Sequence, residues 1–242
     1  MRKVAIFLLV LLGLLIFEKV IESVSDDNWK TAKRNSAGIA PDPQDYSEAV
    51  FQIYAARAYS WKSYFATHTW IAVKEQDAPH YSVYQVLGYY AFFDKPVLSI
   101  HDDIPDRYWF NNLPNIIYDK RGPEAVQLIK ELKDLVPYYP YQQTYFMWPG
   151  PNSNTFVAWV ARNIVNLNVE LPNTAIGKDF IGDEFFAATP SGTGYQISFF
   201  GVFGILVGKA EGVEINIAGL VFGFDPMDLQ IKLPMLGEVN LL

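Results

Sequence analysis

The chain has 242 residues, of which half are hydrophobic, 16% aromatic and 19% charged, with a formal net charge of −7. This length suits one principal domain, and the hydrophobic content is too high for a disordered chain. The negative charge, with no basic stripe to offset it, excludes nucleic acid as an expected partner. The absence of cysteine excludes a disulfide framework, a thiolate nucleophile, a thiolate zinc site and a lipid-modified N-terminal cysteine.

The N-terminus has the features of an export segment. Two basic residues precede an uncharged, mostly apolar run from Val4 to Phe17. This run is shorter than the roughly 20 residues of a straight membrane-spanning helix, and it fits a secretory signal. The alternatives are an uncleaved signal anchor extended by a snorkelling Lys19, and a buried core helix. We favour an anchor over residues 1–24. The leading basic residues then predict an inner-membrane protein with its body on the extracytoplasmic, periplasmic side.

The body of the chain has the pattern of an α+β domain over residues 49–242, with a β-rich C-terminal extension. Residues 25–48 are polar and contain prolines, so they are predicted as a linker. Runs rich in β-formers at 49–55, 68–74 and 81–87 predict strands. Apolar residues on one face predict a helix over 123–136, with one proline in its first turn and further prolines after its end.

The sequence GPNSNTF at Gly150–Phe156 predicts a rigid loop, because it contains two prolines and a glycine. A helix is expected to begin directly after Asn152 or Ser153. The tail from Thr189 onward is apolar and rich in glycine, with alternation at 213–217. This tail favours strands, or a membrane-facing hairpin, over a helix.

Four motifs occur in order along the chain, and their sequences are HTWI at 68–71, GPNSNTF at 150–156, TAIGKDF at 174–180 and TPSGTG at 189–194. Together they resemble the bacterial domain-of-unknown-function family 3750, from about Ala49 to the C-terminus. The family name implies no function. More distantly, a histidine on a strand followed by a nucleophile-type residue at a helix start resembles the circularly permuted papain-like proteins of the NlpC/P60 type.

The papain-like resemblance implies a core in which a small antiparallel sheet packs on the helix that starts near Ser153. That group includes peptidases and acyltransferases, whose nucleophile is normally cysteine. Ser153 stands at that position here. With the N-terminal membrane helix added, the predicted fold is an α+β domain with a papain-like core.

The candidate catalytic residues are Ser153 as nucleophile and His68 as the base that removes its proton. The first amide N–H groups of a helix are unpaired and partially positive, so they stabilise a developing oxyanion. The residues expected to bind substrate or the oxyanion are Asn152, Asn154, Thr155, Trp70 and Trp148. The structural alternative is that Asn152 or Ser153 only caps the helix.

Two hypotheses for function remain open from the sequence. The first is a Ser153/His68 hydrolase or acyl transferase that acts on envelope lipids, lipoproteins or peptidoglycan-linked amides. The second is an inactive envelope scaffold that binds a partner through its glycine-rich apolar tail. His101 and the two following aspartates lack metal-ligating partners at defined spacing, so no metal and no cofactor are expected.

Overall fold

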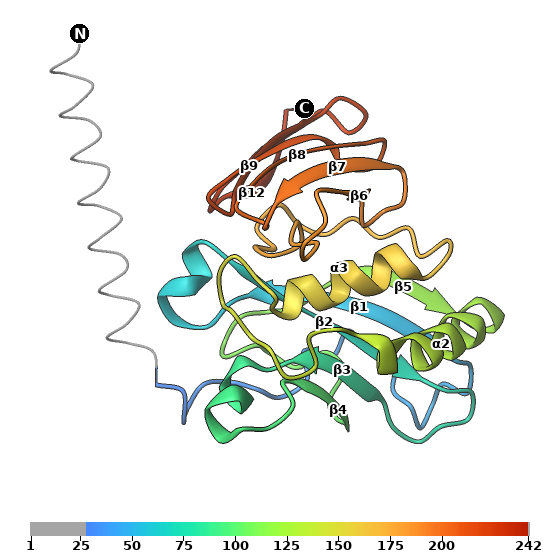
Figure 1. Cartoon of the computed structure of the whole chain (residues 1–242). Helices are drawn as coiled ribbons and strands as arrows, with labels where there is room; N and C mark the ends of the chain where they lie inside the picture. The colour runs from blue at the N-terminus through green and yellow to red at the C-terminus, as the bar shows by residue number, and fades with distance from the viewer. Residues whose placement is uncertain (1–27, 242) are drawn as a thin grey trace, which may run out of the picture.

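A computed structural model describes residues 28–241 of the chain. The predicted anchor over residues 1–24 lies outside this range. Within residues 28–241, no helix combines the length and the apolar character needed to cross a bilayer. Figure 1 shows the described part as layers, with one sheet below, helices in the middle and a second sheet above.

The first sheet is antiparallel throughout, with the strand order β4-β3-β2-β1-β5. Its strands are β1 (Val50–Arg57), β2 (Thr67–Lys74), β3 (Ser82–Val86), β4 (Leu98–Asp102) and β5 (Asn115–Arg121). Every residue of β2 is buried, because β2 is central and both of its faces are covered. The strands predicted at 49–55, 68–74 and 81–87 are confirmed as β1, β2 and β3.

Two helices cover one face of this sheet (Figure 1). They are α2 (Pro123–Leu135) and α3 (Ser153–Asn163), which confirms both helical predictions. Ile71 of β2 points to this face and joins Leu132 and Phe156 in the larger hydrophobic core. The coarse prediction of a mixed fold with antiparallel sheets and few helices is therefore confirmed.

The opposite face of the first sheet is covered by the segment before β1 and by the loop after β4. Trp70 lies here in a second, smaller core. The Asp106 carboxylate accepts hydrogen bonds from the Ser36 hydroxyl at 2.8 Å and the Ile39 amide at 2.7 Å. The Tyr81 hydroxyl donates to the carbonyl of Pro41 at 2.9 Å. The described part of the predicted linker, residues 28–48, is thus packed on the sheet, because it covers aromatic side chains that water would otherwise contact.

The second sheet is a meander in which every strand pairs with its neighbour in the sequence. Its strands are β6 (Phe186–Ala188), β7 (Gly194–Phe199), β8 (Phe203–Gly208), β9 (Gly212–Ile217), β10 (Leu220–Asp225), β11 (Gln230–Leu233) and β12 (Gly237–Asn240). This sheet confirms the prediction that the C-terminal tail is β-rich. It is the layer at the top of Figure 1.

The second sheet is polar on its inner face and apolar on its outer face. Its inner positions include Gln196, Ser198, Glu214, Asn216 and Lys232, which are all buried. We call the outer positions the apolar face, and each is between 41% and 63% exposed: Phe186, Tyr195, Ile197, Phe199, Phe203, Ile205, Val207, Val213, Ile215, Ile217, Phe222, Phe224 and Val239. This is the reverse of the usual arrangement in an antiparallel sheet with one solvated face.

Candidate functional site

The first turn of α3 is closed by its own capping residues. Asn152 is the N-cap, and its Oδ1 accepts hydrogen bonds from the amides of Asn154 at 2.9 Å and Thr155 at 3.2 Å. The Thr155 hydroxyl accepts from the Asn152 amide at 3.1 Å, which completes a reciprocal capping box. The Phe156 amide donates to the Asn152 carbonyl at 3.1 Å. These amides already have partners, so they are not available to an oxyanion.

Asn154 joins three parts of the structure. Its Nδ2 donates to the Thr67 carbonyl on β2 and to the Ile176 carbonyl, both at 2.8 Å. Its Oδ1 accepts from the Thr69 hydroxyl at 2.9 Å. Asn154 is only 3% exposed, so each of these bonds replaces a hydrogen bond to water that burial removes. The Asn154 side chain of the GPNSNTF motif is therefore explained as a tie between α3, β2 and the loop before Lys178.

Gly177 is required in that loop by its close approach to the cap. Its φ is +99°, a region that residues with a side chain rarely adopt. A Cβ at this position would lie 2.4 Å from Asn152 Nδ2. The carbonyl of Gly177 accepts from the Thr155 hydroxyl at 2.8 Å. The TAIGKDF motif thus packs directly onto the GPNSNTF motif.

The structure places His68 and Ser153 on opposite faces of the first sheet. His68 pairs with Ala56 of the smaller core, and its ring stacks on Trp109 at 3.8 Å between centroids. Thr69, one residue further along β2, is the one that faces α3, and its hydroxyl lies 3.5 Å from the Ser153 carbonyl oxygen. The expected Ser153/His68 pair is therefore not brought together, because neighbouring strand residues point to opposite faces.

His68 is also a poor base where it lies. Burial lowers its pKa to about 3, and the contact of its Nε2 with Gln85 Oε1 at 3.4 Å offsets this only in part. A base that weak accepts a proton from a serine hydroxyl inefficiently at neutral pH. His68 is best described as a neutral aromatic-like side chain that supports Trp109.

The two tryptophans predicted to line a groove lie apart from each other. Trp70 is 1% exposed, stacks on Tyr54 at 5.5 Å and donates its Nε1–H to the Pro105 carbonyl at 2.7 Å. Trp148 is half exposed near the second sheet, where it donates to the Ala218 carbonyl at 3.0 Å. They do not form a common groove at Ser153, which is itself 6% exposed.

A cavity of about 570 Å³ opens on the His68 side of the first sheet. Its lining residues are Trp29, Arg34, Tyr59, Val83, Gln85, Leu87, Tyr89, Tyr90, Ser99, His101, Asp103, Arg107, Tyr108, Trp109 and Phe110. Gln85 and Ser99 are paired on β3 and β4 and form its polar floor. Aromatic walls with a few convergent polar groups are typical of small-molecule sites.

This cavity was not predicted from the sequence. The available signal was the polar Gln85 and Ser99, each flanked by apolar residues within β3 and β4, on the side of the sheet that also carries Val83 and His101. The cation Arg34 lies over the ring of Phe110, with 4.4 Å from its guanidinium carbon to the ring centroid. In the part of the chain that the structure describes, Arg107 pairs with Asp103 whereas Arg34 pairs with no carboxylate.

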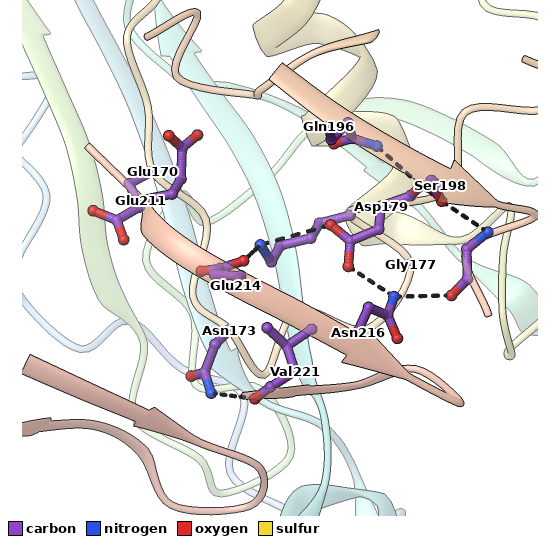
Figure 2. A network of polar contacts seen from close by, with 12 residues as sticks. Glu170, Asn173, Gly177, Asp179, Gln196, Ser198, Glu211, Glu214, Asn216 and Val221 are labelled. Carbon is purple, nitrogen blue, oxygen red and sulfur yellow. Dashed lines mark hydrogen bonds and ion pairs between the residues drawn. The ribbon is translucent and has the colours of Figure 1, made fainter. Parts of the chain in front are cut away.

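A buried charge network joins the second sheet to the rest of the protein (Figure 2). Lys178 is 1% exposed and forms ion pairs with Glu214 and, at 3.7 Å, with Asp179. Burial opposes the charge on Lys178, but these carboxylates outweigh it and raise the lysine pKa. Asn216 donates from Nδ2 to Asp179 Oδ2 at 2.9 Å. These pairings make the network a structural tie, in which the buried Asp179 Oδ1 has the Lys178 ammonium nearby but no hydrogen bond.

Lys232 extends the network along the inner face of the sheet. It is fully buried and forms ion pairs with Glu170 and, at 3.0 Å, with Glu214. Arg162 of α3 donates to the Gln196 side chain at 2.7 Å, and burial lowers its pKa to about 10. The polar and charged residues at inner positions of the second sheet therefore attach it to α3 and to the loop that follows α3.

Within residues 28–241, no group of three or more histidine, aspartate or glutamate side chains is placed to hold a metal ion. The first sheet with its two helices forms an antiparallel α+β domain, and the GPNSNTF motif ties α3 of this domain to β2 and to the loop that contains Ile176 and Gly177. The model of the family "Protein of unknown function (DUF3750)" matches residues 48–180, and the chain belongs to that family. The match covers the first sheet and both helices and ends before the second sheet, although the resemblance was expected to reach the C-terminus.

Comparison with curated proteins found no match, and comparison with solved structures found none either.

Proposed function

We propose that this protein is a non-catalytic binding protein of the cell envelope, which holds an amphiphilic organic anion in the aromatic cavity. The observation that carries the proposal is the cavity of about 570 Å³, with its aromatic walls and polar floor. The closed first turn of α3 supports the absence of catalysis, since three of its amides already have acceptors. The scaffold hypothesis is thereby favoured over the Ser153 hydrolase.

The chemistry of the walls indicates the class of ligand. Stacked aromatic rings favour an apolar ring or chain, and the Trp109 ring of the wall is stacked on the His68 ring. Arg34 lies at the wall as a cation without a carboxylate partner among the described residues, so it suits one acidic group. Gln85 and Ser99 offer hydrogen bonds to further polar atoms. Acidic envelope lipids combine these features.

The envelope location and the papain-like scaffold are parts of the same proposal. The basic residues before the apolar run 4–17 support export with a retained anchor. The first turn of α3 is tied to the central strand β2, which supports a papain-like arrangement of helix and sheet. In this arrangement Thr69, and not His68, faces Ser153.

The binding test uses the full chain and the dye 1-anilinonaphthalene-8-sulfonate, which has aromatic rings and one acidic group. Ser99→Phe fills the floor of the cavity, and Ser82→Phe on the neighbouring strand, outside the cavity lining, is its control. We expect dye fluorescence with wild type and Ser82→Phe, and a clear loss with Ser99→Phe. Equal fluorescence in all three proteins would contradict binding in the cavity.

Arg34→Gln tests the acidic group of the ligand separately. A charge-assisted hydrogen bond contributes about 1.5–3 kcal/mol, so the dye should bind roughly ten- to a hundredfold more weakly. Lys33→Gln removes the neighbouring cation, which lies over Tyr108, and should change the affinity much less. If the two variants bind the dye equally well, Arg34 does not recognise the anion.

Catalysis is tested with a fluorophosphonate probe, which labels activated serines. We expect no labelling of the wild type. Labelling that disappears in Ser153→Ala but persists in Ser191→Ala would reinstate the serine nucleophile and overturn the non-catalytic proposal.

A further inference from the structure

We propose that the apolar face of the second sheet is the interface with a second copy of this chain. The proposal is independent of the cavity, because the face lies on the other sheet and after the part that matches the family model. It starts from the inverted pattern of the sheet, in which half-exposed side chains at the outer positions are all apolar.

The apolar face consists of continuous cross-strand rows. In one row, Ile197, Ile205, Ile215 and Phe222 are direct partners across four consecutive strands. The exposed fractions in this row are 50%, 53%, 47% and 44%. Rows of β-branched and aromatic residues are the kind of surface that packs against another sheet about 10 Å away. Monomeric proteins rarely expose a contiguous apolar patch of this extent.

The area of the face is sufficient for a stable dimer. An aromatic side chain presents roughly 200 Å² when fully exposed and isoleucine and valine somewhat less, so the thirteen half-exposed side chains together present roughly 1,000 Å². A standard interface buries about 800 Å² on each partner. The two copies would use the same patch, as an isologous twofold contact requires.

Charge also favours a second copy over a lipid bilayer. Each chain carries a formal charge of −7, yet the apolar face has no charged residue, so a contact between two such faces places no like charges against each other. The acidic chain is not attracted to an anionic lipid surface. The outer strands β6 and β12 leave open sheet edges, which tolerate water at the rim of a dimer but not the hydrocarbon of a bilayer.

The cysteine-free chain allows a clean cross-linking test in the full-length protein. Ile215 lies on β9, the middle strand of seven, so a twofold axis through the face brings it near its own copy. Val126 on α2 is equally exposed, at 47%, and serves as the matched control. We expect a short bismaleimide to convert most of Ile215→Cys into a covalent dimer and little of Val126→Cys. Ile205→Cys, in the same row, is the second variant in case the first fails to fold.

Four results would overturn the proposal. The first is no covalent dimer at either position of the row, and the second is equal dimer at Val126→Cys. The third combines two observations: Ile215→Cys forms no covalent dimer, and the emission of a polarity-sensitive dye attached to this cysteine shifts to the blue when phosphatidylcholine vesicles are added. That result would assign the face to a bilayer. Persistence of the dimer when Ile205→Asp is added to Ile215→Cys would also contradict a packed apolar interface.

Discussion

Replacing Asn154 by alanine tests whether the GPNSNTF motif is structural. The variant loses three hydrogen bonds and leaves the carbonyls of Thr67 and Ile176 and the hydroxyl of Thr69 without this partner in the interior. At about 1–1.5 kcal/mol for each bond, the free energy of unfolding should fall by about 3–4.5 kcal/mol. That is a large fraction of the 5–15 kcal/mol typical of a whole domain.

Urea denaturation followed by far-ultraviolet circular dichroism measures this loss. Asn163→Ala is the matched control, because Asn163 is on the same helix and its side chain donates only to the Trp159 carbonyl at an exposed site. It should cost well under 1 kcal/mol. Ser153→Ala should also cost little. An Asn154→Ala protein within 1 kcal/mol of wild type, or one no less stable than Asn163→Ala, would refute the structural explanation of the motif.

Three further substitutions test other parts of the structure. His68 is protonated below about pH 6.5 in the unfolded chain but only near pH 3 in the folded protein, so the free energy of unfolding of wild type should fall by about 2 kcal/mol relative to that of His68→Gln between pH 7 and pH 5. A difference between the two proteins that stays the same in urea titrations at both pH values would contradict this. Gly177→Ala should lower the melting temperature far more than Gly38→Ala, because both have positive φ but only Gly177 lies against Asn152. Glu214→Gln leaves two buried lysines without their shared carboxylate and should cost about 3–5 kcal/mol in chemical denaturation, while a loss under 1 kcal/mol would show that the network is weak.

The elements of the family domain were predictable because their signals are local. The β-rich runs became β1, β2 and β3, and the apolar periodicity with Pro123 in the first turn became α2. The cap of α3 followed from the residue type at Asn152. These features depend on backbone preferences and on spacing of two or 3.6 residues, which a sequence contains directly.

The candidate site was less predictable because it depends on which face of β2 packs against α3. Both His68 and Thr69 are buried on β2, and alternation separates them without indicating which one faces α3. The answer depends on the segment 28–48 and the loop around Trp109, which cover the His68 side. Those contacts join residues that are far apart in the chain. The cavity has the same origin, since its wall residues come from four separate segments.

The second sheet shows the same ambiguity in reverse. The alternation of Val213, Glu214, Ile215, Asn216 and Ile217 predicts a strand, and the usual rule would turn the apolar residues inward. Here the polar residues point inward, because the surface that they meet is itself polar. Lys178, Asp179 and Arg162 require charged or hydrogen-bonding partners when buried, and the inner positions of the sheet supply them.

The polar attachment has a consequence for the outer face. Buried ion pairs give little net stability compared with apolar packing, so the inner face orients the second sheet more than it stabilises it. Most of the hydrophobic stabilisation available to β7, β8 and β9 resides in the outer rows, which stay half exposed in a single chain. A second copy that covers those rows would supply the apolar burial that the inner face lacks. The inverted sheet is therefore better understood as half of a sandwich than as a complete layer.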